Sequence, residues 1–276
     1  MPLLTLANVS RRLATLEREA LSPIGDVPTD PVEFAARVGL EDLDGWQEEL
    51  LLSEAPRILL NITRQGGKST MSGVLAVHKA LTDAGSLVLI LAPSERQAKE
   101  TFAKAAALYR HDVPADSYRK LGMELRNGSR IEALPGSERT VRGYSGVDLL
   151  ILDEAARVED GLYYAVRPML AVSGGRLLMM STPFGKRGVF FEEWTSEAGG
   201  DWERYEVSAS ECPRIPPEFL EEERRTLPRR VYRQEYENFF EQTEDSVFSH
   251  EDVQAAISDE VTPLFGSSAG EPHGGA

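Results

Sequence analysis

The stretch TRQGGKST, residues 63–70, directly follows the apolar run RILLNI of residues 57–62. This order predicts a strand, a phosphate-binding loop and a helix that begins at Ser69. Backbone N–H groups, the Lys68 ammonium and the Ser69 hydroxyl would then surround one small volume, where the helix N-terminus also favours negative charge. Such a volume suits a nucleoside triphosphate with Mg²⁺. The stretch therefore indicates a nucleotide site.

The loop departs from the usual pattern in two places. The position six residues before Lys68 normally holds glycine, and here it holds Ile62. An arginine, Arg64, lies inside the loop, where it could reach a phosphate or organise a carboxylate. Taken alone, this degenerate loop fits a glycine turn before an ordinary helix as well as it fits a nucleotide site.

A second element, an apolar strand that ends in two carboxylates, changes that balance. The run LLILDE, residues 149–154, predicts a buried strand with Asp153 and Glu154 at its carboxyl end. Asp153 would hold Mg²⁺, usually through water, and Glu154 would polarise the water that attacks the γ-phosphate. Two solvated acids in a turn are the ordinary alternative. Because the pair follows a Gly-Lys-Ser loop, however, the two elements together predict nucleotide hydrolysis.

Three more residues could serve the same site. Ser181 and Thr182 follow the apolar run of residues 176–180, and the ends of parallel strands meet at one crevice. Their hydroxyls could sense the γ-phosphate, although a simple strand-ending turn is equally compatible. The amide of Gln47 could both donate to and accept from adenine. From the residues alone, a solvent-facing position for Gln47 is slightly favoured.

Arginines supply a third kind of candidate. Arg64 could organise the Glu154 carboxylate as well as reach a phosphate. Arg142 lies eleven residues before Asp153, in a segment expected to be an exposed loop. There it could stabilise transition-state charge in its own site or in a neighbouring subunit, although most arginines form surface salt bridges. We expect three other cations to be solvated: Arg157, Arg167 and Lys186.

Length and composition are those of a globular protein, with 276 residues, 41% of them hydrophobic and 27% charged. The single cysteine, Cys212, excludes an internal disulfide, and no apolar stretch approaches the ~20 residues of a membrane span. The net charge of −15 is uneven, because the forty residues from Glu237 onward hold nine acids and no lysine or arginine. Composition neither supports nor excludes a DNA partner.

Predicted strands and helices alternate along most of the chain, which indicates an α/β fold with a mostly parallel, buried sheet. The turn Asn127-Gly128 additionally predicts a hairpin. The expected strands are 57–62, 87–92, 149–152, 176–180 and 205–209. The expected helices are 6–20, 31–38, 47–52, 69–82, 95–109, 161–170, 188–194, 217–227 and 229–240.

The combination of motifs resembles the large terminase subunit of tailed bacteriophages, the motor that pumps DNA into capsids. The resemblance covers roughly residues 46–248, and the loop with its internal arginine is its most specific part. It is carried by Gln47, by TRQGGKST, and by LILAPSERQAKETF (89–102), VRG (141–143), LLILDEAA (149–156) and MMSTPFGKRG (179–188).

By this resemblance the protein hydrolyses ATP. Ser69 and Asp153 would ligate Mg²⁺, and Glu154 would be the catalytic carboxylate. Arg142 matches an arginine that acts between neighbouring subunits of a ring, and Arg64 is a further catalytic candidate. The residues expected to bind the nucleotide are Gln47, Arg64, Gln65, Gly66, Gly67, Lys68, Ser69 and Thr70. Gln47 would read adenine, and Ser181 with Thr182 would form the coupling motif.

The resemblance also implies a fold and partners. The fold is a three-layer P-loop NTPase of the RecA/ASCE type with a small helical lid. We expect a helical lead-in over residues 1–45, the ATPase core over 46–212, the lid and linker over 213–260 and a disordered tail over 261–276. The implied partners are double-stranded DNA, a portal protein, a small terminase subunit and further copies of the chain in a ring. No membrane partner is expected, and the implied location is the cytoplasm of the infected bacterium.

The sequence departs from the family at its C-terminal end. Family members continue into an RNase H-like nuclease domain, whereas here one acidic helix and a Gly/Ser-rich tail follow Phe248. We therefore expect an ATPase motor module without nuclease activity. A helicase-like translocase is one alternative, but it usually needs a second nucleotide-fold lobe. A non-catalytic terminase remnant is another, and the intact Lys68, Asp153 and Glu154 argue against it.

Overall fold

The computed structural model describes residues 27–110, 115–136, 141, 143–196 and 202–242. The described residues up to Glu241 belong to one compact unit. Four of the expectations lie outside the described residues. They are the helix at residues 6–20, the role of Arg142, the linker beyond residue 242 and the disordered tail.

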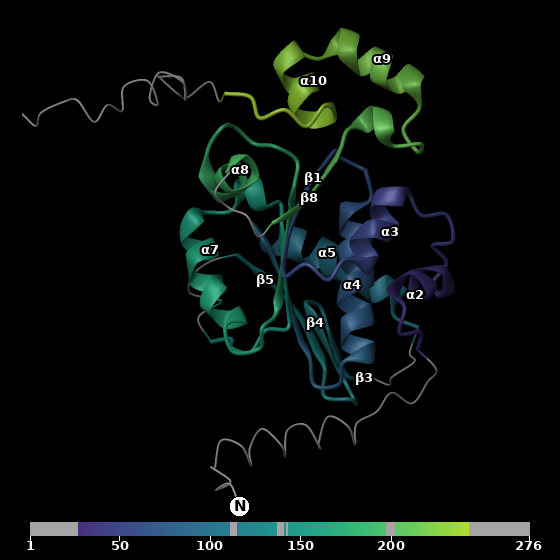
Figure 1. Ribbon diagram of the computed structural model, residues 1–276, viewed down its shortest axis with the longest axis vertical. Helices are drawn as coiled ribbons and strands as arrows, with labels where there is room; N and C mark the ends of the chain where they lie inside the picture. The colour runs from purple at the N-terminus through teal and green to yellow at the C-terminus, as the bar shows by residue number, and fades with distance from the viewer. Residues whose placement is uncertain (1–26, 111–114, 137–140, 142, 197–201, 243–276) are drawn as a thin grey trace, which may run out of the picture. The chain divides into compact units, whose positions relative to one another are not determined.

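Eight strands form one sheet in the described part of the chain (Figure 1). Their order is β3-β4-β5-β2-β6-β7-β1-β8. The last six strands in this order run parallel to one another, and β4 runs antiparallel to both β3 and β5. The strands are β1 (Arg57–Ile62), β2 (Leu87–Ala92), β3 (Ala115–Arg119), β4 (Gly122–Leu125), β5 (Arg130–Pro135), β6 (Leu149–Asp153), β7 (Arg176–Ser181) and β8 (Glu203–Val207).

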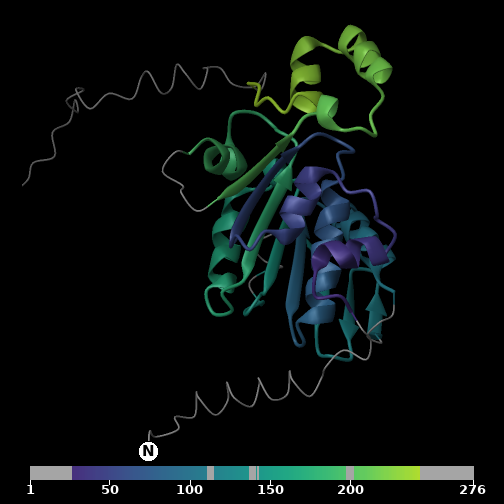
Figure 2. The same ribbon diagram turned by 45° about the vertical axis from the view of Figure 1, so that its right-hand side comes forward.

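Helices cover both faces of the sheet, which gives three layers (Figures 1 and 2). One face packs against α2 (Pro31–Arg37), α3 (Gly45–Leu52), α4 (Lys68–Thr82) and α5 (Glu95–Leu108), and the other against α7 (Asp160–Val166) and α8 (Gly188–Thr195). Side chains alternate between the two cores along each strand, so that Ile58 and Leu60 face the first set and Leu59 the second. Burial on both faces explains the continuous apolar runs.

The predicted α/β fold class is confirmed. The bounds of β1 and β2 match the expected residues, and β4 and β5 form the hairpin predicted around Asn127-Gly128. Strand β3 was not predicted, because its residues ADSYR are polar and partly exposed and carry no apolar periodicity. Strand β8 begins two residues earlier than expected, and α10 ends at Tyr236 instead of Phe240.

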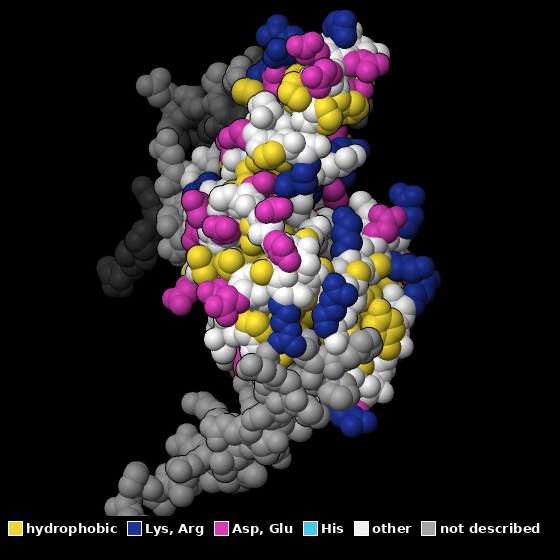
Figure 3. Space-filling view, turned by 90° about the vertical axis from the view of Figure 1, so that its right-hand side faces the viewer, with side chains coloured by type: hydrophobic (Ala, Val, Ile, Leu, Met, Phe, Trp, Pro, Cys, Tyr) yellow, Lys and Arg dark blue, Asp and Glu magenta, His cyan; other side chains and the backbone are white. Residues whose placement is uncertain are grey.

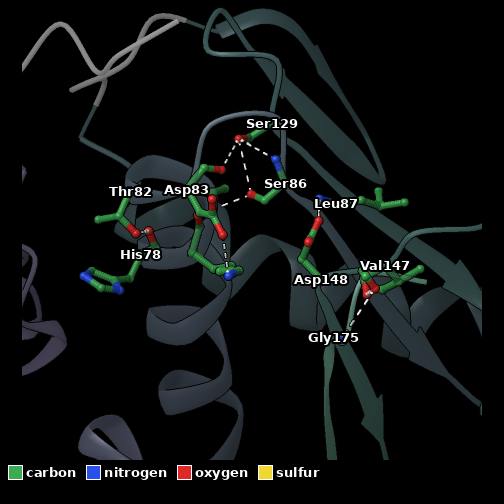
Figure 4. A network of polar contacts seen from close by, with 12 residues as sticks. His78, Thr82, Asp83, Ser86, Leu87, Ser129, Val147, Asp148 and Gly175 are labelled. Carbon is green, nitrogen blue, oxygen red and sulfur yellow. Dashed lines mark hydrogen bonds and ion pairs between the residues drawn. The ribbon is translucent and has the colours of Figure 1, made fainter. Parts of the chain in front are cut away.

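Polar side chains join the amino ends of the strands, at the sheet edge opposite the predicted nucleotide site (Figure 4). The buried Ser129 hydroxyl donates to the Asp83 carbonyl over 3.0 Å and accepts from the Ser86 backbone N–H over 3.2 Å. The Asp148 carboxylate accepts from the Leu87 N–H over 2.8 Å. Because these bonds satisfy buried polar groups, they fix the strand ends of β2, β5 and β6 relative to α4.

A close backbone contact at the same edge gives a stability prediction. A Cβ atom on Gly175 would lie 2.0 Å from the Val147 carbonyl oxygen. Gly175→Ala should therefore lower the free energy of unfolding by about 2 kcal/mol or more, since the backbone must separate. Gly45→Ala is the control, because nothing lies within 4 Å of its Cβ position. Urea unfolding measures both, and an equal effect of the two substitutions would contradict the contact.

Helices α9 (Pro217–Thr226) and α10 (Arg229–Tyr236) lie beyond the carboxyl end of β1 (Figures 1 and 2). We call residues 217–242 the C-terminal helical segment. Helix α9 buries no residue, and α10 buries only Tyr232. Specific bonds attach the segment to β1: the Asn61 and Asn238 side-chain amides donate to each other's backbone carbonyls over 3.2 and 3.1 Å. The segment therefore rests on polar contacts more than on a core of its own.

One face of the molecule carries mixed charge. Figure 3 shows acidic and basic side chains on the face beside α3 and α9, with neither sign covering it alone. The described helices include none that is long and apolar enough to cross a membrane. The charge on this face, like the composition, neither supports nor excludes a DNA partner.

Candidate nucleotide site

Three neighbouring strands bring the predicted site residues to one edge of the sheet. Strand β7 lies between β6 and β1, and all three run parallel, so their carboxyl ends meet. The phosphate-loop candidate follows β1. Ser181 ends β7 and Thr182 follows it, and Asp153 ends β6 and Glu154 follows it. Ser181, Thr182, Asp153 and Lys68 are all buried. The edge is a place where parallel α/β sheets bind ligands.

The loop after β1 folds tightly against its own strand. Gly67 has φ of 101° and is the N-cap of α4, which begins at Lys68, one residue earlier than expected. That left-handed conformation strains any residue other than glycine. A Cβ on Gly66 would lie 2.6 Å from Ile62 Cγ2, so the non-glycine residue at this variant position contacts the loop directly. The arrangement places the N-terminus of α4, with its backbone N–H groups, at the sheet edge.

Lys68 lies inside this edge with little compensation for its charge. Its Nζ donates a long hydrogen bond, 3.4 Å, to the Ile62 carbonyl oxygen. Burial lowers the pKa of the Lys68 ammonium, and the nearby Glu154 and Asp153 carboxylates oppose that shift. The Ile62 carbonyl oxygen is a neutral acceptor, whereas a bound phosphate would give the ammonium an anionic one and so a stronger hydrogen bond.

Asp153 and Glu154 have different surroundings although they are adjacent. Asp153 is buried, accepts hydrogen bonds from the Thr101 hydroxyl and the Glu154 N–H, and burial raises the pKa of its carboxyl group, against those two bonds. Glu154 has φ of 51°, a left-handed conformation that is uncommon for residues other than glycine and is found at functional sites. Thr101, on α5, was not singled out from the sequence, because only the fold brings α5 to this edge.

Gln47 packs beside the loop. Its side chain is buried and its Oε1 accepts from the Asp44 N–H over 3.0 Å, so the solvent-facing alternative is wrong. A Cβ on Gly67 would lie 2.7 Å from the Gln47 Nε2. Arg214 completes this corner: it contacts the Asp44 carboxylate through two bonds of 3.1 and 2.6 Å and donates to the Gly66 carbonyl over 3.2 Å. No local pattern pointed to Arg214, which lies far from the loop in sequence.

The structure gives the arginines partners that the sequence did not predict, while a contact of Arg64 with a phosphate stays a prediction. Arg64 is 61% exposed and forms an ion pair with Glu235 of α10. The partner of the Glu154 carboxylate is instead Arg157, at 2.8 Å from Nη1 to Oε2, so the prediction of a solvated Arg157 is wrong. Its position three residues after Glu154 was the one available signal. Of the other two cations expected in solvent, Arg167 is exposed but stacks on Tyr163, and Lys186 is half-buried.

The remaining predicted residues keep their assignments without a test. Gln65 has φ of 59°, and Ser69 and Thr70 lie half-buried in the first turn of α4. In the described part of the chain, no group of three or more His, Cys, Asp or Glu side chains could hold a metal by itself. The expected lack of nuclease activity stays a prediction.

The fold and this edge define an α/β protein of the P-loop NTPase class. The sequence profile of the family described as "Terminase large subunit, T4likevirus-type, N-terminal" matches residues 59–255. That is well over half of the 276 residues, so the chain belongs to the terminase large-subunit family.

Named relatives agree with this assignment. The chain is 27% identical to the terminase large subunit of Escherichia phage T5 over 197 residues, which cover 68% of the chain and 44% of the relative. It is also 27% identical to the terminase large subunit of Thermus virus P23-45, with 73% of the chain and 49% of the relative covered. The chain thus spans about half the length of these relatives.

Solved structures share the fold. The large terminase ATPase domain of Thermus phage P74-26 matches with a TM-score of 0.65 and 23% identity, covering 79% of this chain and 99% of that one. The large terminase of another thermophilic bacteriophage, solved in complex with ADP, matches with a TM-score of 0.63 and 13% identity, covering 72% of this chain and 54% of that one.

Proposed function

We propose that this chain is the ATP-hydrolysing module of a phage DNA-packaging motor. The observation that carries the proposal is the sheet edge where the buried Lys68 ammonium lies near the Asp153 and Glu154 carboxylates, with Ser181 and Thr182 on the strand between. A cation beside two acids at a helix N-terminus is the arrangement that a triphosphate and a hydrolytic water require. Membership of the terminase family supports ATP as the substrate.

Each residue has a defined part in this proposal. Lys68 and the N–H groups of the α4 N-terminus bind the β- and γ-phosphates. Glu154 orients the attacking water and polarises it, because a carboxylate at this place can accept its proton. Ser181 and Thr182 would lie beside the γ-phosphate, and they begin the segment that leads to α8. Loss of that phosphate would therefore act first on this strand end.

Magnesium fits the donors at this edge when phosphate supplies the other oxygens. Ser69 and Asp153 would hold it, since hard oxygen ligands and a few waters are the usual set for this ion. When bound, the ion would neutralise charge on the phosphates. Burial raises the pKa of the Asp153 carboxyl group. A cation bound beside it would favour the ionised carboxylate and so oppose that rise.

Asp153→Asn tests this assignment. The magnesium concentration that gives half-maximal phosphate release should rise about tenfold or more, as when a metal's supporting carboxylate is lost. Asp116→Asn, on the exposed strand β3, is the matched control and should change nothing. The same magnesium requirement in the Asp153 variant and in wild type would exclude Asp153 from the metal site.

Gln47 gives a prediction about the base. Gln47→Ala should raise the KM for ATP about 5–30-fold, the effect of losing one or two buried hydrogen bonds, and should leave the KM for GTP nearly unchanged. Glu48→Ala, the exposed next residue on α3, is the control. Steady-state phosphate release with the two nucleotides measures the ratio. Equal losses for ATP and GTP would assign Gln47 to the loop's structure and not to adenine.

A packaging motor needs more than an ATP site. We propose that the C-terminal helical segment is the lid that closes over ATP, and that copies of the chain form a ring on a portal protein. Double-stranded DNA and a small terminase subunit complete the assembly in the cytoplasm of the infected bacterium. The role of Arg142 between subunits is part of the same proposal.

DNA movement has its own test. With procapsids, portal and small subunit from the same phage, the chain should make labelled double-stranded DNA resistant to added DNase when ATP is present. A chain that hydrolyses ATP but protects no DNA in this complete mixture would exclude the motor and leave only the ATPase.

A further inference from the structure

Arg157 contacts three elements that the proposed reaction must coordinate. Its Nη1 lies 2.8 Å from the Glu154 carboxylate at the end of β6 and 3.5 Å from the Thr182 hydroxyl oxygen at the end of β7. Its Nη2 lies 3.9 Å from the Glu235 carboxylate on α10. One side chain thus joins the carboxylate proposed to activate water, the strand end beside the γ-phosphate position and the C-terminal helical segment.

The guanidinium is held in place by its surroundings. It stacks over the Phe184 ring at 4.6 Å from the ring centroid, and the side chain is 23% exposed. A planar guanidinium with a fixed orientation presents donors in several fixed directions, which a lysine cannot do. The Phe184 ring therefore sets the plane in which Arg157 reaches Glu154 and Thr182.

The side chain is not needed to form the local turn. The 3-10 turn η1 (Ala155–Arg157) is closed by backbone bonds, from the Arg157 N–H to the Glu154 carbonyl over 2.8 Å and from the Val158 N–H to the Ala155 carbonyl over 3.2 Å. Both bonds join backbone atoms and do not involve the Arg157 side chain. The contacts of the guanidinium therefore serve something other than the path of the chain.

Arg64 does not share this task. Its side chain is 61% exposed and its ion pair is with Glu235. Glu235 thus lies between the two arginines, and charges of opposite sign alternate along the series Glu154, Arg157, Glu235 and Arg64. In this series, Arg157 is the member in contact with Glu154.

We propose that Arg157 is a positioning residue that orients the Glu154 carboxylate for water activation and links it to Thr182. This inference rests on the proposed ATPase function and deepens it. Glu154 is 25% exposed at its side chain, so without a partner the carboxylate can rotate among several rotamers. The ion pair and the hydroxyl contact limit that freedom. Loss of such orientation costs rate and leaves substrate binding largely intact.

The first experiment compares variants of the full chain. Arg157→Ala should lower kcat for ATP hydrolysis about 10–100-fold, the scale of a misplaced catalytic group, with the KM for ATP changed less than about threefold. Arg157→Lys should fall between Arg157→Ala and wild type, because it keeps the charge but loses the planar donors. Arg187→Ala is the matched control, since Arg187 stacks on the same Phe184 ring at 5.6 Å. It should keep wild-type kcat.

The second experiment separates positioning from a structural role. If Arg157 acts through Glu154, then Arg157→Ala should cause little further loss of single-turnover rate in a Glu154→Gln background. Losses that multiply in the double variant would overturn the proposal, and so would wild-type kcat in Arg157→Ala. Urea unfolding checks each variant, and Arg157→Lys carries the test if Arg157→Ala does not fold.

These outcomes differ from a failure of the ATPase proposal. A wild-type chain without turnover would reject the ATPase. A wild-type chain that turns over while Arg157→Ala matches it would reject only the positioning role.

Discussion

Glu154→Gln should abolish most ATP turnover while the protein still binds ATP. The amide keeps the shape of the carboxylate and can still accept from Arg157, but it cannot take a proton from water. General base catalysis contributes about 10²–10⁴-fold, so kcat should fall by that factor with a nearly unchanged KM. The backbone of Glu154 adopts an uncommon left-handed conformation that holds this side chain at the end of β6, so we expect the loss of turnover at this position and not at exposed carboxylates nearby.

Glu159→Gln provides the matched comparison for this result. Glu159 is an exposed carboxylate five residues further along the chain, just before α7. Its variant should retain wild-type turnover. If Glu154→Gln lowered kcat no more than Glu159→Gln does, another group would have to activate the water.

Lys68→Ala should lower kcat/KM for ATP about 10²–10³-fold, the scale of losing a charged donor that stabilises a developing anion. The side chain is buried near Asp153 and Glu154, so its removal also takes away a positive charge that offsets these two acids where phosphate must enter. Like charges would then repel the triphosphate. Direct binding of a fluorescent ATP analogue and phosphate release together measure the effect.

A second lysine of α4 shows whether the loss of ATP binding comes from removing any positive charge of the helix or from removing the one at the proposed nucleotide site. Lys79, near the other end of α4, forms an ion pair with Asp83 at 2.5 Å. Lys79→Ala should leave ATP binding unchanged and should have at most a small effect on stability. Equal losses in both variants would show that Lys68 supports α4 and not the nucleotide.

Much of the fold and site could be predicted where sequence signals are local. The runs RILLNI and LVLILA are continuous and apolar because both faces of the sheet are covered, and their strands match the expected bounds. The loop around Lys68 and the acids after β6 follow from spacing on neighbouring strands. Their meeting at one sheet edge is a consequence of parallel strand order, which the alternation of helices and strands already indicated.

Long-range partners could not be predicted. Glu235 and Arg214 contact the loop although they lie more than 140 positions after it in the sequence. Thr101, on α5, contacts Asp153 at the end of β6. Nothing in their immediate sequence marks them, because only the packed structure sets these contacts. Arg157 was within reach of a local argument, since a residue three positions after Glu154 returns to the same side of a short turn. Its surroundings, Thr182 and Phe184, come from the segment that follows strand β7.

The central claim, ATP hydrolysis at this sheet edge, is tested most directly by single-turnover phosphate release from radiolabelled ATP. The measurement uses the full chain with Mg²⁺ and double-stranded DNA, and compares wild type with Glu154→Gln and Lys68→Ala. We expect wild type to release phosphate, Glu154→Gln to bind ATP but release phosphate about 10²–10⁴-fold more slowly, and Lys68→Ala to be impaired in both binding and release. Phosphate release at the same rate by all three proteins would contradict the account.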